Sequence, residues 1–164
     1  MAKKKVDKRI RNRKASHDYQ LEQTFDAGMV LTGPEIKSIR DGKASITEAY
    51  CILTDNGAIV KGMHIAEFRN AGYVEQEPLR DKQLLLTKNE LKKIRLKLKD
   101  VGYTLIPLEV FFSDSGYAKL KIALARGKKT VDKREDLKSK DQEREMRRFV
   151  RWFMWTNNNF EPWD

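Results

Sequence analysis

The sequence predicts a mainly β fold with peripheral helices (α+β), in the form of a small antiparallel β-barrel followed by a tail that lacks a core. Three observations lead to this prediction: a long apolar-rich first segment, two pairs of apolar runs that are each joined by a tight turn, and two helix-start signals between the runs. With 164 residues, the chain can bury one sizeable core and still carry appendages.

The strands are predicted by alternating apolar and polar residues and by the turn residues between them. Asp55-Asn56-Gly57 and Asp114-Ser115-Gly116 each separate two apolar runs, which is typical of β-hairpins. Ala27-Gly28 predicts a bend or bulge in the first strand, and residues 66–83 are expected to be irregular. We expect strands over residues 18–31, 46–54, 58–65, 104–112 and 117–125.

The first predicted helix begins near Thr32 and ends at Gly42. Thr32 as the N-cap would form a capping box with Glu35, whereas Gly33 as the N-cap would place Pro34 at the first helical position. Both starts remain open at this point.

The second predicted helix begins with a capping box, Thr87-Lys88-Asn89-Glu90, and ends before Gly102. Five or six strands with a helix before the last hairpin are compatible with an OB-type barrel, a frequent scaffold for nucleic-acid binding. The apolar face of this helix is formed by Leu91, Ile94 and Leu98, and its other positions form a basic surface of Lys88, Lys92, Lys93, Arg95, Lys97 and Lys99.

The last quarter of the chain differs from the rest. A basic turn at residues 126–134 leads into residues 132–145, where Leu137 is the only large apolar side chain, so this part cannot bury enough surface to offset its ordering entropy. We expect three parts: a basic N-terminal arm (1–14), an OB-like barrel domain (15–126) and a basic, amphipathic C-terminal tail (127–164). The tail also carries an apolar stripe at helical spacing, formed by Met146, Phe149, Val150, Phe153 and Met154. This stripe packs either on the chain's own barrel or in a groove of a partner.

The charge distribution indicates a nucleic-acid-binding protein. The net charge is +10, and the arm holds eight Lys and Arg against one Asp, whereas residues 15–125 hold fifteen charged residues of each sign. A neutral body with positive ends is typical of polyanion binders, and the alternative is a surface that only aids solubility. No apolar run approaches the roughly 20 residues that span a bilayer, and no signal peptide is present. We therefore expect a cytoplasmic monomer without membrane contact.

The sequence offers little support for catalysis. Cys51 is the only cysteine, which excludes an internal disulfide and a multi-cysteine zinc site. His17-Asp18 near Glu22 could serve in acid–base cleavage of RNA, but no second motif marks a nucleophile or a metal site, so we expect His17 to make a structural hydrogen bond. We predict no enzymatic activity, no catalytic residue, no metal and no cofactor.

Five motifs occur along the chain in a specific order: residues 12–19 (NRKASHDY), 33–42 (GPEIKSIRDG), 62–65 (GMHI), 84–90 (LLLTKNE) and 127–134 (GKKTVDKR). Together they resemble the small protein B family, the SsrA-binding proteins, from about residue 10 to about residue 140. The resemblance implies an OB-like barrel and an RNA-binding adaptor of trans-translation. Such an adaptor binds the tRNA-like domain of transfer-messenger RNA (tmRNA) and delivers it to stalled ribosomes, with its tail in the empty decoding site and mRNA channel of the small subunit. The alternative, from the barrel and the basic ends alone, is a generic OB-type single-stranded RNA-binding protein.

The resemblance also implies where the RNA contacts lie and that the tail is helical only when bound. One departure is Val131, which stands where the family has an aromatic residue thought to stack on a base of the decoding centre. For tmRNA binding the resemblance implies Asn12, His17, Tyr19, Asp26, Gly28, Glu35, Lys37, Arg40, Leu85 and Thr87. For ribosome binding it implies Gly127, Lys128, Lys129, Asp132, Lys133 and Arg134.

Overall fold

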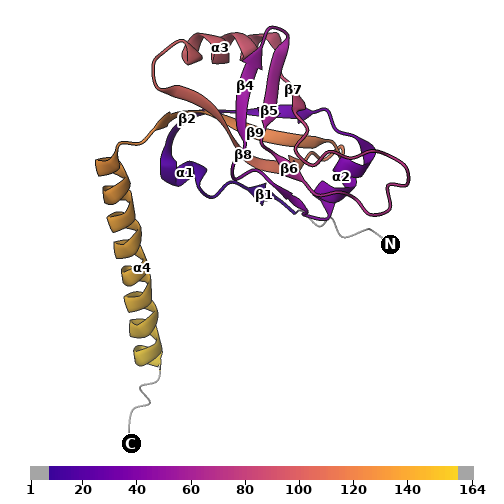
Figure 1. Ribbon diagram of the computed structural model, residues 1–164. Helices are drawn as coiled ribbons and strands as arrows, with labels where there is room; N and C mark the ends of the chain where they lie inside the picture. The colour runs from indigo at the N-terminus through magenta and orange to yellow at the C-terminus, as the bar shows by residue number, and fades with distance from the viewer. Residues whose placement is uncertain (1–7, 159–164) are drawn as a thin grey trace, which may run out of the picture. The chain divides into compact units, whose positions relative to one another are not determined.

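Seven strands form one antiparallel sheet in the first of the two units into which the chain divides, Met1–Gly127 and Lys128–Asp164 (Figure 1). The computed structural model describes residues 8–158, except for the side chains of residues 130–137 and 155–158. The predicted N-terminal arm is therefore described from Lys8 onward, and its residues 1–7 lie outside the described residues.

The sheet closes into a barrel. Its strand order is β1-β8-β4-β5-β7-β2-β9, and β9 pairs again with β8. All the pairings are antiparallel, which confirms the predicted mainly β, barrel-like fold. The strands of the barrel are β1 (Ile10–Arg11), β2 (Tyr19–Met29), β4 (Tyr50–Thr54), β5 (Gly57–Lys61), β7 (Lys82–Leu85), β8 (Tyr103–Phe112) and β9 (Ala118–Gly127), and two short strands, β3 (Ala44–Ser45) and β6 (His64–Ile65), pair with each other.

Both predicted hairpins are confirmed, since β4 pairs with β5 and β8 pairs with β9. Alternation along β9 buries Leu120, Ile122 and Leu124 almost completely, as the sequence pattern predicts for a strand with one face in a core. Apolar residues from all sides of the barrel and from two helices join them in one core cluster.

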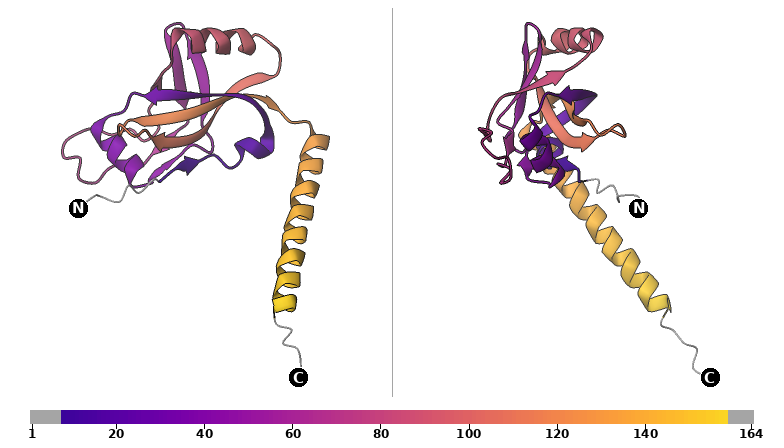
Figure 2. Two further views of the ribbon diagram at one scale, coloured as in Figure 1. Left: turned by 180° about the vertical axis from the view of Figure 1, so that it is seen from behind. Right: turned by 90° about the vertical axis from the view of Figure 1, so that its right-hand side faces the viewer.

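Helices α2 (Gly33–Arg40) and α3 (Lys88–Leu98) lie at separate ends of the barrel unit (Figures 1 and 2). Each contributes one fully buried isoleucine to the core, Ile39 and Ile94. Thr32 is the N-cap of α2, and its N–H donates to the Glu35 carboxylate at 2.8 Å, which decides between the two starts that the sequence leaves open. Thr87 caps α3 as predicted, and its N–H donates to a carboxylate oxygen of the third helical residue at 2.9 Å.

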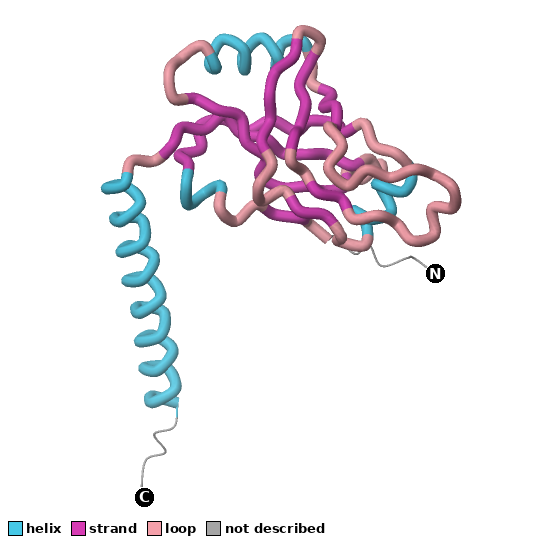
Figure 3. Tube along the Cα trace, in the orientation of Figure 1, coloured by secondary structure: helices cyan, strands magenta, loops and turns pink. Residues whose placement is uncertain are grey.

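Two local expectations need correction. Residues 66–83 are expected to be irregular, and residues 66–81 are, but Lys82 begins β7, which bridges β5 and β2 and so completes the barrel (Figure 3). Alternation misses this strand because a lysine occupies a core position of it. The bulge of β2 is not at Ala27-Gly28, which stay in register with β9, but at Glu22, because the register shifts between Leu21 and Gln23.

The second unit contains a single long helix, α4 (Thr130–Asn158). The tail is expected to be helical only when bound, whereas here it is helical in the chain by itself. Ion pairs one turn apart support it, between Arg144 and Asp141 at 3.7 Å and between Arg147 and Glu143. The five residues of the predicted apolar stripe are between 44% and 67% exposed. No helix in the described part of the chain is long and apolar enough to cross a membrane.

Candidate nucleic-acid interface

An apolar groove of about 580 Å³ lies where β2, β7, α2 and the β8–β9 turn meet. It brings together three of the predicted RNA-contact residues, Gly28, Arg40 and Leu85. Strand pairing explains this, because Gly28 of β2 lies opposite Leu85 on one side and Lys119 of β9 on the other. The groove combines apolar walls with the cations Arg40 and Lys119, and RNA offers the matching groups, flat bases and phosphates.

Gly28 allows Leu85 to approach it closely across the strand pair. A Cβ at position 28 would lie 3.3 Å from the Cβ of Leu85, so the leucine would have to shift by a few tenths of an ångström to accommodate it. Leu85 is 56% exposed at the groove. Asp26, two residues earlier in β2, lies on the same face by strand alternation and pairs in register with Lys121. The β2 face therefore presents one acidic position beside the groove.

A second hollow, of about 300 Å³, lies beside the short helix α1 (Ala15–Asp18) and is lined by Asn12 and Tyr19. The strand β8 fixes Asn12, whose N–H donates to Leu108 O at 2.7 Å and whose Nδ2 donates to Pro107 O at 3.1 Å. The Asn12 Oδ1 is buried and has no hydrogen-bond partner among the described residues. This acceptor would be satisfied by a donor from outside the chain.

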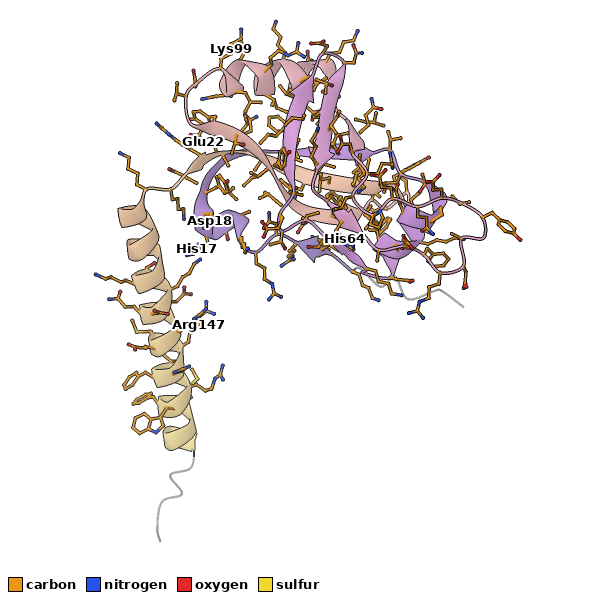
Figure 4. All side chains as sticks on the ribbon, viewed as in Figure 1. His17, Asp18, Glu22, His64, Lys99 and Arg147 are labelled. Carbon is orange, nitrogen blue, oxygen red and sulfur yellow. The ribbon has the colours of Figure 1, made fainter. Side chains whose placement is uncertain are left out.

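His17 lies in α1, where its Nδ1 is 2.9 Å from Asp18 Oδ1 (Figure 4). Glu22 is engaged elsewhere, because its bulge position turns it toward Tyr103, whose hydroxyl donates to Glu22 Oε1 at 2.5 Å. The Glu22 Oε2 lies 3.9 Å from Lys97 Nζ. Glu22 therefore does not join His17 and Asp18, and His17 makes a hydrogen bond with its sequence neighbour.

Glu35 lines neither the groove nor the hollow beside α1. Its carboxylate is buried and accepts two hydrogen bonds from Arg80, 3.1 Å from Nε and 2.7 Å from Nη2, as well as the one from Thr32. Burial raises the pKa of the Glu35 carboxyl, but the hydrogen bonds from Arg80 and Thr32 and the Arg80 charge lower it more, so the pKa lies below its ordinary value. Glu35 thus ties α2 to the loop before β7.

The ion pair between Glu35 and Arg80 predicts that the folded state loses stability in acid. A carboxyl with a lowered pKa in the folded state stabilises the fold above its unfolded pKa, and this stabilisation disappears as the pH falls through the folded pKa. We expect Glu35→Gln to unfold more easily than the natural chain at pH 7, with the difference in free energy of unfolding narrowing as the pH falls below about 4.5. Urea titrations at several pH values measure this difference in the free energy of unfolding. The control is Glu67→Gln, which removes an exposed carboxylate. A difference that stays constant with pH would contradict the assignment.

Three other predicted residues are held by neighbours. The Nζ of Lys37 lies 5.3 Å from the centre of the Phe68 ring, and the guanidinium of Arg40 lies 5.5 Å from the centre of the Phe112 ring. Both cations remain exposed, so the rings restrict their motion without removing their charge from solvent. The hydroxyl of Thr87 donates to Glu90 at 2.8 Å as part of the α3 cap.

Sequence reasoning missed several residues of these surfaces. Tyr117 and Lys119 line the groove, and Tyr117 is 74% exposed; its place after Gly116 in the hairpin turn was the only signal for it. Arg80 and Lys82 gave no signal because they stand in or beside a segment without a regular pattern. Lys82 is fully buried, and burial lowers the pKa of its ammonium group despite the opposing charge of Glu35.

The predicted ribosome-binding residues begin where β9 ends. Gly127 is the last residue of β9, Lys128 is half-buried and Lys129 is exposed. Asp132, Lys133 and Arg134 follow on α4 with Val131, and their side chains lie outside the described residues.

The chain is similar to known proteins over most of its length. The family described as SmpB protein matches residues 3–152. An SsrA-binding protein of Bacteroides thetaiotaomicron is 48% identical over 142 residues, which cover 87% of this chain and 95% of that protein. One of Cytophaga hutchinsonii is 48% identical over 139 residues, covering 85% and 91%. A chain in the solved structure "tmRNA-SmpB: a journey to the center of the bacterial ribosome" is 38% identical with a TM-score of 0.63, covering 74% of this chain and 85% of that chain.

Proposed function

The chain belongs to the SmpB family of SsrA-binding proteins, and from this membership we propose that it is an RNA-binding adaptor of trans-translation. It binds tmRNA and brings it to stalled ribosomes. The observation that carries this function is the identity with SsrA-binding proteins over most of the chain, together with the likeness of its barrel to a chain of the tmRNA–SmpB structure.

The tRNA-like domain of tmRNA binds at the groove and beside α1. The groove supplies Gly28, Leu85 and Arg40, with Asp26 at its edge, and its supporting geometry is the close approach of Leu85 to Gly28. A structured RNA is recognised mainly through its shape, its phosphates and its few unstacked bases, which suits a rigid apolar groove with cations at its rim. The contact beside α1 is the hollow lined by Asn12 and Tyr19. His17, Lys37 and Thr87 are further proposed contact residues, in or next to this hollow or the groove.

The tail occupies the empty decoding site and mRNA channel of the small ribosomal subunit. Two features support this placement of the tail: the exposed apolar stripe of α4 and the basic side chains within residues 127–134. A helix that lacks a core of its own is stabilised when a partner covers it. The protein thus works in three parts, the arm (1–14), the barrel (15–126) and the tail (127–164), and the end of the arm joins the barrel sheet because β1 pairs with β8. It acts by binding rather than by catalysis, without a cofactor, in the cytoplasm where ribosomes stall.

A competition titration at fixed salt tests this function. The labelled tRNA-like domain of tmRNA is bound to the full chain and then displaced with either the same RNA unlabelled or an unstructured RNA of equal length. We expect the unstructured RNA to compete at least about 10-fold more weakly, because it shares the phosphates but not the shape. Equal competition by the two RNAs would instead indicate a general single-stranded RNA-binding protein.

A further inference from the structure

The outer face of α3 concentrates positive charge that neither the groove nor the tail accounts for. Residues 15–125 are neutral as a whole, but residues 88–99 hold six cations and one acid, Glu90. Leu91, Ile94 and Leu98 turn toward the barrel and are buried or half-buried. The six exposed cations, which we call the α3 basic face, are Lys88, Lys92, Lys93, Arg95, Lys97 and Lys99.

Most of the charge of the α3 basic face is not neutralised by the described part of the chain. Within it, Lys88, Lys92, Lys93 and Lys99 form no ion pair with a carboxylate, whereas Lys97 Nζ lies 3.9 Å from Glu22 Oε2. Arg95 donates only to a backbone carbonyl at 3.3 Å. The single acid of the helix is used at its start, where the carboxylate accepts the hydrogen bonds of the N-cap.

This arrangement is unfavourable for the helix itself. Lys88 and Lys92, Lys93 and Lys97, and Arg95 and Lys99 each stand four residues apart on α3, and like charges at this spacing destabilise a helix. The apolar inner face holds α3 in place against this repulsion. A polyanion bound along the outer face would relieve it.

We propose that the α3 basic face binds the phosphate backbone of the tRNA-like domain of tmRNA, as a contact that extends the groove; this proposal rests on the proposed function. The argument for this RNA is continuity, because α3 begins at Lys88, three residues after Leu85 of the groove. The 11 residues of α3 extend for about 16 Å, enough to follow several phosphates of one strand. Lysines act there as point charges, so the face holds the RNA in position without reading its sequence. Figure 4 shows Lys99 at the end of α3.

The test is the salt dependence of binding to the isolated tRNA-like domain. The full chain with Lys92→Gln, Lys93→Gln and Lys99→Gln is compared with the natural chain over a series of KCl concentrations. We expect the slope of log affinity against log salt to shrink by about 2, at roughly 0.7–0.9 for each phosphate that the protein no longer neutralises. The matched control removes the same charge outside α3, through Lys43→Gln, Lys61→Gln and Arg69→Gln, and is expected to change the slope by less than half as much.

Each other outcome has a distinct meaning. An α3 variant that behaves like its control would show that the face is only solvated and would overturn the proposal. An unchanged affinity for the tRNA-like domain with a weaker affinity for ribosomes would assign the face to ribosomal RNA and would also overturn it. Failure of the proposed function is seen separately, because the natural chain would then not prefer the tRNA-like domain over unstructured RNA. The melting temperature is expected to stay or rise as repulsion is removed, and a lower one would mean that the lysines serve the fold instead.

Discussion

Replacing Lys128, Lys133 and Arg134 together with alanine is expected to abolish tagging on stalled ribosomes and to leave tmRNA binding nearly unchanged. Lys128 follows β9 directly, and Lys133 and Arg134 follow it along the chain on α4. If each cation makes one charge-assisted contact to ribosomal RNA, worth roughly 1.5 kcal/mol or more, their joint removal lowers ribosome engagement at least about 1,000-fold. The measurements are addition of the tag on a truncated message in a reconstituted system and, in parallel, affinity for the tRNA-like domain.

A second triple variant separates position from total charge. Lys138→Ala, Lys140→Ala and Arg144→Ala remove the same charge from exposed positions of the same helix. We expect this control to lose less tagging, because it leaves the predicted ribosome-binding residues within 127–134 unchanged. If the first variant lost tmRNA binding in step with tagging, the assignment of two separate RNA surfaces would be wrong.

Lys82→Ala is expected to lower the free energy of unfolding by about 3–5 kcal/mol, enough to reduce the melting temperature by roughly 10 °C. Lys82 is fully buried in β7, and its Nζ donates to Met63 O at 2.7 Å and to Pro78 O at 3.1 Å. Alanine leaves a cavity in place of the long side chain and removes the donors from two inward-facing carbonyls. Thermal and urea unfolding of the full chain measure the effect.

Two control variants give the cause of that destabilisation. Lys82→Met keeps most of the volume and removes only the hydrogen bonds and the charge, so we expect it to be more stable than the alanine variant. Lys61→Ala removes a lysine whose ion pair with Asp81, at 3.4 Å, lies at the surface, where such pairs contribute about 0–1 kcal/mol. Hydrogen exchange of the Ile65 amide, which donates to Pro78 O, is expected to speed up in Lys82→Met. A destabilisation below about 1 kcal/mol for Lys82→Ala would contradict a structural role for this lysine.

Most of the elements could be predicted because their signals are local. Asp55-Asn56-Gly57 predicts its hairpin from three neighbouring residues, and Thr87 with Glu90 predicts the start of α3 from four. The same is true of the charge at the two ends of the chain and of the ordered motifs that resemble the family. Local signals fail where a polar residue takes a core position, as Lys82 does in β7.

The sequence names single candidate residues but not their arrangement in space. Gly28 and Leu85 prove to be cross-strand neighbours in one groove, whereas Glu35, predicted beside them, is buried against Arg80. Tyr117 reaches the same groove from a distant hairpin turn. No pattern within a short window contains these relations, since they follow from which strands pair.

Patterns along the chain were enough to assign the family, the mainly β fold, both hairpins, the cap of α3, and the basic character of α3 and of the chain's ends. Folding in three dimensions was needed to establish that β7 closes the barrel, that Glu22 forms the bulge, and that Glu35 and Lys82 are structural. The difference lies in how far apart along the chain the interacting residues stand. Turns, caps and alternation act within a few residues. The hydrogen bonds between Glu35 and Arg80 and between Lys82 and Met63 instead join residues 45 and 19 positions apart and exist only once the barrel has closed around them.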